Sequence, residues 1–314
     1  ASVYPDSRFI GVDFNPDHVA MARDLAARAG LTNVDVQEAS FTGLGDLDLP
    51  VADFVGMNGI YSWISESLVA AVQGFLQTNL RAGGLFYVEY TTLPGMVAVK
   101  PLWDFLKGLV PNDGQSTRAR AEACLDRLET LLQAGSAYIR QNPAVANAAR
   151  SYVQGRKNDP YTVDHFAHNV LAEGWHPRYT PEMLAELNGI GLSYAGRTEL
   201  ALNEMDLAVP SGHMPTLKTI TETGEVERYK DFVRNERNRR DVFVMQGRRD
   251  PQAAASFLTE RLRYVTRASG TDVARAVPVF GGQRQPLEGP VYDALIDAFD
   301  GAGAALTETQ ALAR

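Results

Sequence analysis

Along the first 100 residues, short apolar runs typical of buried strands alternate with longer stretches whose apolar residues recur at helical spacing. The run Phe9–Val12 ends at Asp13, and a helix is predicted over 16–29, where Asn15 can cap it and Pro16 suits its first position. Strand-like runs follow at 34–36, 53–60 and 85–90, with a helical stripe over 66–80 that ends at 82–84. Because the connections are short, this alternation predicts an α/β fold with a doubly wound, mostly parallel sheet.

The later part of the chain changes character. From about 96 to 152 the pattern is helical, and the amphipathic stretch 115–141 predicts an insertion that either caps a cofactor cleft or forms a dimer contact. Two late strands are predicted at 192–195 and 241–245, with a charged helix over 226–239 between them. Its arginine-rich run Arg234–Arg240 is most simply a solvated helix face. Past Asp250 we expect a helix, a hairpin through 265–280 and a further helix over 291–299.

These patterns predict four parts. They are an α/β core over 1–110, a helical insertion over 111–178, late strands and helices of the core over 179–249, and the start of a C-terminal module over 250–314.

Composition excludes some classes of function. The 314 residues are 45% apolar and 22% charged, with a formal net charge of −8 and no basic block, which argues against a nucleic-acid ligand. The sequence has no run of about 20 apolar residues, so no membrane span is expected. The single cysteine, Cys124, suits a reducing compartment, and a cytoplasmic location is predicted.

Asp13 is the first residue that suggests chemistry. Open α/β sheets use a carboxylate at the end of a strand, just before a helix, to hold the two ribose hydroxyls of an adenosine cofactor. The alternative is that Asp13 only completes the turn, but Asn15 is already available as the helix cap. A glycine-rich strand–turn–helix unit usually precedes such an acid by about 20 residues. None occurs before Asp13 here, and we expect the native polypeptide to carry that unit ahead of Ala1.

Several motifs fall in the order seen in class I S-adenosylmethionine-dependent methyltransferases, which the chain resembles. They are Asp13, Ala39-Ser40-Phe41, the run Phe54–Trp63 and Leu80–Gly84. Phe54–Ile64 and Tyr87–Gly95 look more narrowly like methyltransferases with a methyltransferase regulatory domain, a group that includes rickettsial-type protein-lysine methyltransferases. His165–Tyr179 and Asp231–Phe243 resemble the regulatory segment itself.

The resemblance implies that S-adenosylmethionine is the cofactor and that the core is Rossmann-like, lacking its glycine-rich first motif. Asp13 would hold the ribose, and Phe14 would border the adenine. The other implied cofactor contacts are Ala39, Ser40 and Phe41 at the adenine, and Asn58 and Gly59 beside the methionine part and the methyl group.

On the acceptor side, the resemblance implies walls made by Tyr61, Trp63 and Tyr90, which are the predicted catalytic residues. Alternatively, these rings pack under the helical insertion.

The predicted reaction is methyl transfer to a protein or small-molecule acceptor, with an amine, and lysine above all, favoured. Two alternatives stay open: a catalytically silent S-adenosylmethionine-binding regulatory or assembly module, and a small-molecule methyltransferase. A nicotinamide dehydrogenase is disfavoured by the turn over 58–63. His165 and His168 are read as packing or capping residues, so no metal site is predicted.

Overall fold

The computed structural model describes residues 1–172, 174–247, 250–261, 263–264, 275–278, 284–300 and 306–307. The chain divides into two compact units. The first comprises Ala1–Thr198 and Ile220–Gln246, and the second comprises Glu199–Thr219 and Gly247–Arg314.

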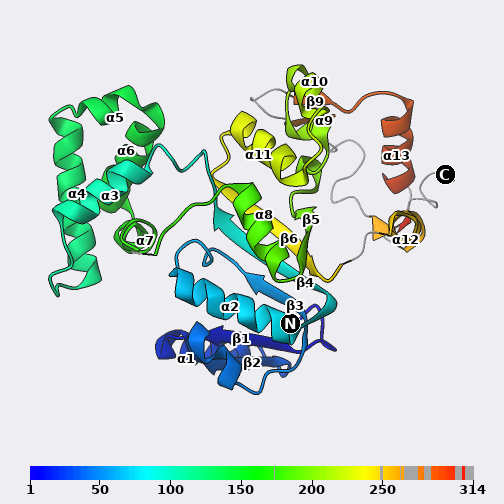
Figure 1. Cartoon of the computed structure of the whole chain (residues 1–314), viewed down its shortest axis with the longest axis horizontal. Helices are drawn as coiled ribbons and strands as arrows, with labels where there is room; N and C mark the ends of the chain where they lie inside the picture. The colour runs from blue at the N-terminus through cyan, green and yellow to red at the C-terminus, as the bar shows by residue number, and fades with distance from the viewer. Residues whose placement is uncertain are drawn as a thin grey trace. The chain divides into compact units, whose positions relative to one another are not determined.

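The first unit contains two sheets (Figure 1). Its strands are β1 (Phe9–Asp13), β2 (Val34–Glu38), β3 (Ala52–Met57), β4 (Leu80–Thr91), β5 (Leu192–Arg197) and β6 (Asn238–Met245). β1 and β2 pair in parallel, while the main sheet has the order β3-β4-β6-β5. β3 and β4 are parallel, and β6 runs antiparallel to both of its neighbours. Among the described residues, β1 and β3 each pair with another strand on one side only.

Helices connect the parallel strands as the sequence predicts. α1 (Pro16–Arg28) joins β1 to β2, and its cap is Asn15, whose side chain accepts the Asp17 N–H at 2.9 Å. A 3₁₀ helix, η1 (Phe41–Asp46), follows β2, and α2 (Glu66–Asn79) joins β3 to β4. α8 (Thr180–Gly189) precedes β5, and α11 (Thr223–Arg234) precedes β6. One apolar core is shared by α2, α8 and strands β3 to β6, with Leu76, Phe86, Met183 and Phe243 fully buried.

The insertion between β4 and α8 is a helical bundle with a core of its own. It consists of α3 (Lys100–Leu109), α4 (Thr117–Gln133), α5 (Ala137–Gln141), α6 (Pro143–Asn158) and α7 (Tyr161–Val170). The buried residues of its core run from Val99 to Trp175, and they include Leu106, Leu125 and Phe166. The first of these helices begins at Lys100, within the stretch from about 96 where the sequence predicts helix. The cap or dimer contact expected of it stays a prediction.

The second unit is made of short elements. They are η2 (Leu200–Leu202), α9 (Met205–Ala208), η3 (Ser211–His213), α10 (Met214–Leu217), α12 (Pro251–Ser256), the π-helical turn η4 (Phe257–Arg261), β7 (Arg263–Tyr264), β8 (Ala276–Pro278), β9 (Arg284–Pro286), α13 (Pro290–Asp300) and β10 (Leu306–Thr307). β8 pairs antiparallel with β9, and β10 with β7. Most of the hairpin expected through 265–280 lies outside the described residues.

Two boundaries differ from the sequence-based expectation. The glycine pair 83–84 does not end α2. The helix stops at Asn79, and β4 begins at Leu80, so both glycines lie in the strand. The charged helix α11 ends at Arg234, because Asn235 adopts the left-handed conformation with φ of 50°. Arg239 and Arg240 therefore belong to β6, and their interpretation as a helix face is wrong. No helix among the described residues combines the length and the apolar content that crossing a membrane requires.

Candidate functional site

Asp13 closes β1, and the turn that follows fixes its carboxylate. The backbone N–H of Asn15 donates to Asp13 Oδ1 at 2.8 Å, and His18 Nδ1 lies 3.5 Å from Asp13 Oδ2. The side chain remains 41% exposed. The carboxylate is thus oriented by the chain and still accessible to a ligand. His18 is a neighbour that the sequence pattern does not reveal, because Asp13 lies in β1 and His18 in the first turn of α1.

The residues after β2 lie beside this turn. The Ala39 N–H donates to the Asp13 carbonyl at 3.1 Å, so the carboxyl ends of β1 and β2 are in direct contact. Ser40 Oγ lies 2.8 Å from Thr42 Oγ1. Phe41 packs against the main-sheet core, whereas Phe14 is 74% exposed. The structure therefore brings Asp13 and Ala39 together and leaves the Phe14 ring open to a partner.

Asn58 and Gly59 follow the carboxyl end of β3. Asn58 Oδ1 accepts a hydrogen bond from the Tyr87 hydroxyl at 2.8 Å, which ties this turn to β4. Gly59 has φ of +67°, and no atom lies within 4 Å of where its Cβ would be. A glycine here permits the left-handed turn, and open space lies where its side chain would be.

Tyr61 lies inside the protein. Its side chain has no exposed surface, and its hydroxyl donates to Glu186 Oε1 at 2.9 Å and accepts from Gln73 Nε2 at 2.9 Å. The Arg178 guanidinium lies 5.8 Å from the Tyr61 ring centroid and pairs with Glu186. Burial raises the pKa of the Tyr61 phenol, so it stays protonated.

Trp63 belongs to an aromatic group that joins the α/β core to the helical insertion. It stacks on Trp175 with ring centroids 5.6 Å apart, and its ring lies 6.0 Å from that of His168. Trp175 Nε1 donates to Thr91 Oγ1 at 3.2 Å, at the end of β4. Lys100 Nζ lies 5.9 Å from the Trp175 ring centroid. Trp175 was missed because more than 100 residues separate it from Trp63.

Tyr90 is buried against an ionic group that we call the Arg239 cluster. Its members are Arg239, Asp241, Asp231, Glu227 and Lys230, with the hydroxyls of Tyr90, Tyr194 and Thr180. The Tyr90 hydroxyl donates to Asp241 Oδ2 at 2.7 Å, and its pKa is raised well above the usual value by burial. Tyr90 and Tyr61 are therefore both enclosed by protein, and of the three predicted acceptor-side rings only Trp63 is partly exposed.

The two histidines singled out in the sequence take different partners. His165 lies beside Tyr152, with ring centroids 5.9 Å apart, while His168 faces Trp63. Within the described ranges, no group of three or more His, Cys, Asp or Glu side chains is arranged to hold a metal ion.

Comparison with known proteins places these observations in a family context. Residues 163–245 match a family model described as a predicted methyltransferase regulatory domain. An uncharacterized protein of Synechocystis sp. is 32% identical over 244 residues, which are 78% of this chain and 47% of that protein. An uncharacterized protein of Rickettsia prowazekii is 24% identical over 241 residues, which are 76% of this chain and 42% of that protein. The chain thus spans about half the length of the curated relatives it matches.

Among solved structures, PKMT2 from Rickettsia typhi in complex with AdoHcy has a TM-score of 0.68 at 16% sequence identity, covering 98% of this chain and 60% of that chain. This likeness concerns the fold. The comparisons confirm the resemblance drawn from the sequence motifs and the predicted α/β fold. The matched stretch 163–245 contains α8, β5, α11 and β6, so it supplies two of the four strands of the main sheet.

Proposed function

Because this chain has the fold of class I methyltransferases, we propose that it binds S-adenosylmethionine and takes part in transferring the methyl group from the sulfonium to a nucleophile. The observation that carries the proposal is the Asp13 carboxylate at the end of β1. The turn orients it, and it is 41% exposed. The PKMT2 structure contains AdoHcy, which is the molecule left when S-adenosylmethionine has given up its methyl group.

In this proposal Asp13 accepts hydrogen bonds from the two ribose hydroxyls, and Phe14 covers the adenine. Ala39, Ser40 and Phe41 border the adenine from the end of β2. Asn58 and Gly59 contact the methionine part, where the open space beside Gly59 gives the cofactor close access.

The protein's part in the chemistry is mainly positioning. Methyl transfer from a sulfonium is an in-line displacement, so holding the acceptor in line with the methyl group supplies most of the rate. We propose an amine acceptor, with lysine on a protein favoured. Stacked Trp63 and Trp175 support this choice, because aromatic faces attract cations and Lys100 already lies 5.9 Å from the Trp175 ring. The amine must lose one proton to solvent before attack, and desolvation beside aromatic rings eases that loss by lowering the pKa of the amine.

The burial of Tyr61 and Tyr90 favours a second candidate. Both hydroxyls are already bonded to carboxylates of the protein, so neither ring lines an open acceptor site here. A module that binds S-adenosylmethionine and serves in regulation or assembly without transferring a methyl group fits that observation.

Calorimetric titration with S-adenosylhomocysteine tests the proposal in the full-length protein. Replacing Asp13→Ala should weaken binding at least about tenfold, since a charge-assisted hydrogen bond contributes about 1.5–3 kcal/mol. Asp17→Ala is the matched control, because Asp17 is an exposed acid in the same turn. Equal affinity in the wild type and Asp13→Ala, with both folded, would refute the cofactor assignment.

The acceptor requires a separate measurement. Mass spectrometry of lysine peptides, small amines and phenols incubated with S-adenosylmethionine should show methylation at nitrogen. Transfer to oxygen alone would contradict the amine proposal, and no transfer despite cofactor binding would favour the silent module.

A further inference from the structure

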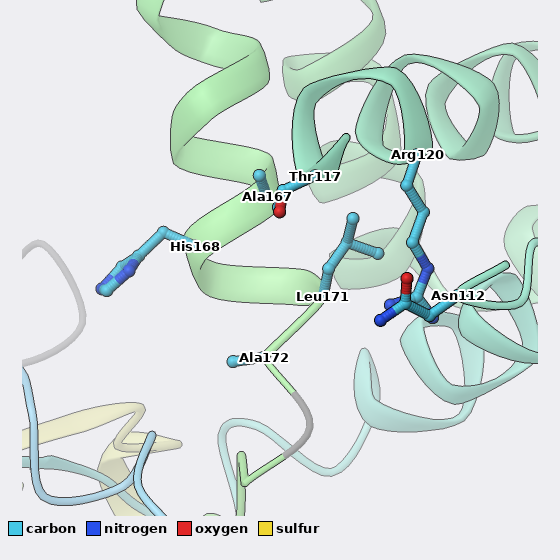
Figure 2. Close-up of a pocket in the computed structure, with 7 residues that line it drawn as sticks. All are labelled: Asn112, Thr117, Arg120, Ala167, His168, Leu171 and Ala172. Carbon is cyan, nitrogen blue, oxygen red and sulfur yellow. The ribbon is translucent and has the colours of Figure 1, made fainter. Parts of the chain in front are cut away.

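A pocket in the helical insertion contains a buried positive charge that the proposed methyl transfer does not use. It has a volume of about 340 Å³ and is lined by Asn112, Thr117, Arg120, Ala167, His168, Leu171 and Ala172. Figure 2 shows the Arg120 side chain reaching down from α4 to lie beside Asn112, while Ala167, Leu171 and Ala172 form the apolar side. The His168 ring extends away from Arg120.

Arg120 is only 8% exposed. Its Nε donates to the Val110 carbonyl at 2.9 Å, but its two terminal nitrogens have no hydrogen-bond or ion-pair partner among the described residues. Neither terminal nitrogen is completely enclosed, so both are open to the pocket. A guanidinium that has lost most of its hydration and has no counter-charge is unfavourable, because the lost hydration is only partly replaced. The other buried cations of the described chain differ. Arg197, Lys230 and Arg239 have a carboxylate oxygen at 2.9, 2.8 and 2.7 Å respectively.

The nearby carboxylates are engaged elsewhere. Asp164 and Glu122 both pair with Arg118, at 2.7 and 3.5 Å, and Asp113 accepts the Gln115 N–H at 3.3 Å. Among the described residues, no acidic side chain lines the pocket. The counter-charge that Arg120 lacks is therefore not available from these neighbours.

The position of the pocket adds to its positive potential. α4 is 17 residues long, and Thr117, its first residue, lines the pocket. The Ser116 side chain caps only the Ala119 N–H, at 3.2 Å. The first N–H groups of a helix carry a partial positive charge and bind anions. Arg120 lies one turn further along, so its charge and the end of the helix act at the same place.

We propose that this pocket binds the oxyanion group, carboxylate or phosphate, of a small ligand whose carbon part packs on Ala167, Leu171 and Ala172. Arg120 supplies the charge, and Thr117 and Asn112 supply further polar contacts. The site is independent of the proposed cofactor residues, so its test requires neither S-adenosylmethionine nor activity.

The direct test observes backbone amide resonances of the 314-residue wild-type chain during titration with inorganic phosphate or benzoate. Sodium chloride keeps the ionic strength constant, and neutral benzamide is the control for benzoate. We expect saturable shifts at Thr117, Arg118 and Arg120, with no comparable shift at Asp17 in the first turn of α1. Saturation by phosphate or by benzoate identifies the ligand class, and saturation by either supports the site. Equal shifts at both helix starts, or none near Arg120, would overturn the proposal.

A variant pair gives the second measurement. Arg120→Gln should weaken the binding of the probe that saturates the site at least about tenfold, whereas Arg127→Gln, an exposed arginine of the same helix, should leave it unchanged. If the affinity is the same in Arg120→Gln and the wild type, the assigned role of Arg120 is wrong. The wild-type titration stands even if Arg120→Gln fails to fold.

Discussion

The two most instructive arginines of this chain are both buried but have opposite surroundings. Arg239 has no exposed surface and contacts three carboxylates, Asp231, Asp241 and Glu227, at 2.7 to 2.9 Å. Arg120 is 8% exposed and contacts no carboxylate of the described residues. Burial alone therefore does not reveal what a charge is for. A fully compensated charge belongs to the architecture, whereas an uncompensated one points to a ligand.

The Arg239 cluster shows what compensation achieves. Asp231 and Glu227 come from α11, Asp241 and Arg239 from β6, and Tyr90 from β4. The cluster therefore fixes one helix over two paired strands. All of its members except Tyr90 lie within residues 163–245, the stretch that matches the regulatory-domain model. The parts of that stretch that lie in the first unit, 163–198 and 220–245, are thus built into the main sheet through β5 and β6.

The largest effect should come from breaking the compensated arginine. Arg239→Met leaves three carboxylates around an apolar side chain, and we expect a loss of about 3–5 kcal/mol in the free energy of unfolding. Urea denaturation of both proteins measures it.

Arg240→Met is the matched control, because the next side chain of β6 points to the other face and is 52% exposed. Its change should stay within about 1 kcal/mol. Similar losses in the two variants would mean that the cluster has no special role in stability.

A smaller effect, a dependence of the free energy of unfolding on pH, should come from the carboxylates of the cluster. Arg239 and Lys230 supply two positive charges, while Asp231, Asp241 and Glu227 supply three carboxylates. A third buried cation, Arg197, lies at the border of the cluster, with Nη1 3.9 Å from Asp231 Oδ1. Burial, which outweighs the attraction of Arg239, raises the pKa of Asp231 to about 6. Because the folded pKa lies above the unfolded one, folding takes up a proton between roughly pH 4 and pH 6. The stabilisation from that proton is present below the unfolded pKa and is lost as the pH rises through about 6.

Asp231→Asn removes this dependence. The stability of the wild type relative to Asp231→Asn should therefore fall by about 1–3 kcal/mol between pH 4 and pH 7. Glu227→Gln should show the opposite dependence of stability on pH. Although burial acts against it, Arg239 and Lys230 lower the pKa of Glu227, so the advantage of the wild type over Glu227→Gln should grow as the pH rises. Parallel pH profiles for the two variants would rule out the assigned proton.

Much of the fold could be predicted from the sequence because it depends on local signals. Asn15 and Pro16 fix the start of α1, and apolar spacing identifies α2 and the strands around it. The failures lie where tertiary contacts override a local signal. Glycines at 83–84 suggested a helix end, yet Leu80 pairs with Ala52 of β3, and this pairing extends the strand back to Leu80.

The candidate site, like the fold, could be predicted from the sequence only where the signal is local. Asp13 could be identified because a strand end and a helix cap enclose it. The environments of Tyr61 and Tyr90 could not, because Glu186 and Asp241 are 125 and 151 residues away in sequence. Arg239 was read as a solvated charge, although the alternation over 238–245 is that of a strand with one face buried. The roles of the predicted site residues themselves stay predictions.

The smallest effect should come from removing the uncompensated arginine. Arg120→Met keeps most of the side-chain volume and removes a buried charge that has no carboxylate partner, so the loss of stability seen in Arg239→Met should not recur. It gives up only the hydrogen bond to the Val110 carbonyl, which contributes about 1 kcal/mol, and it avoids the desolvation of the guanidinium. In a buffer free of phosphate and carboxylates, its free energy of unfolding should therefore lie within about 1 kcal/mol of the wild type, or above it. Adding phosphate or benzoate, whichever saturates the wild-type site, should then stabilise the wild type and leave Arg120→Met unchanged, because only a folded state that binds the anion gains from it. A loss as large as that of Arg239→Met, with no anion present, would show that Arg120 is structural and would remove the distinction between the two arginines.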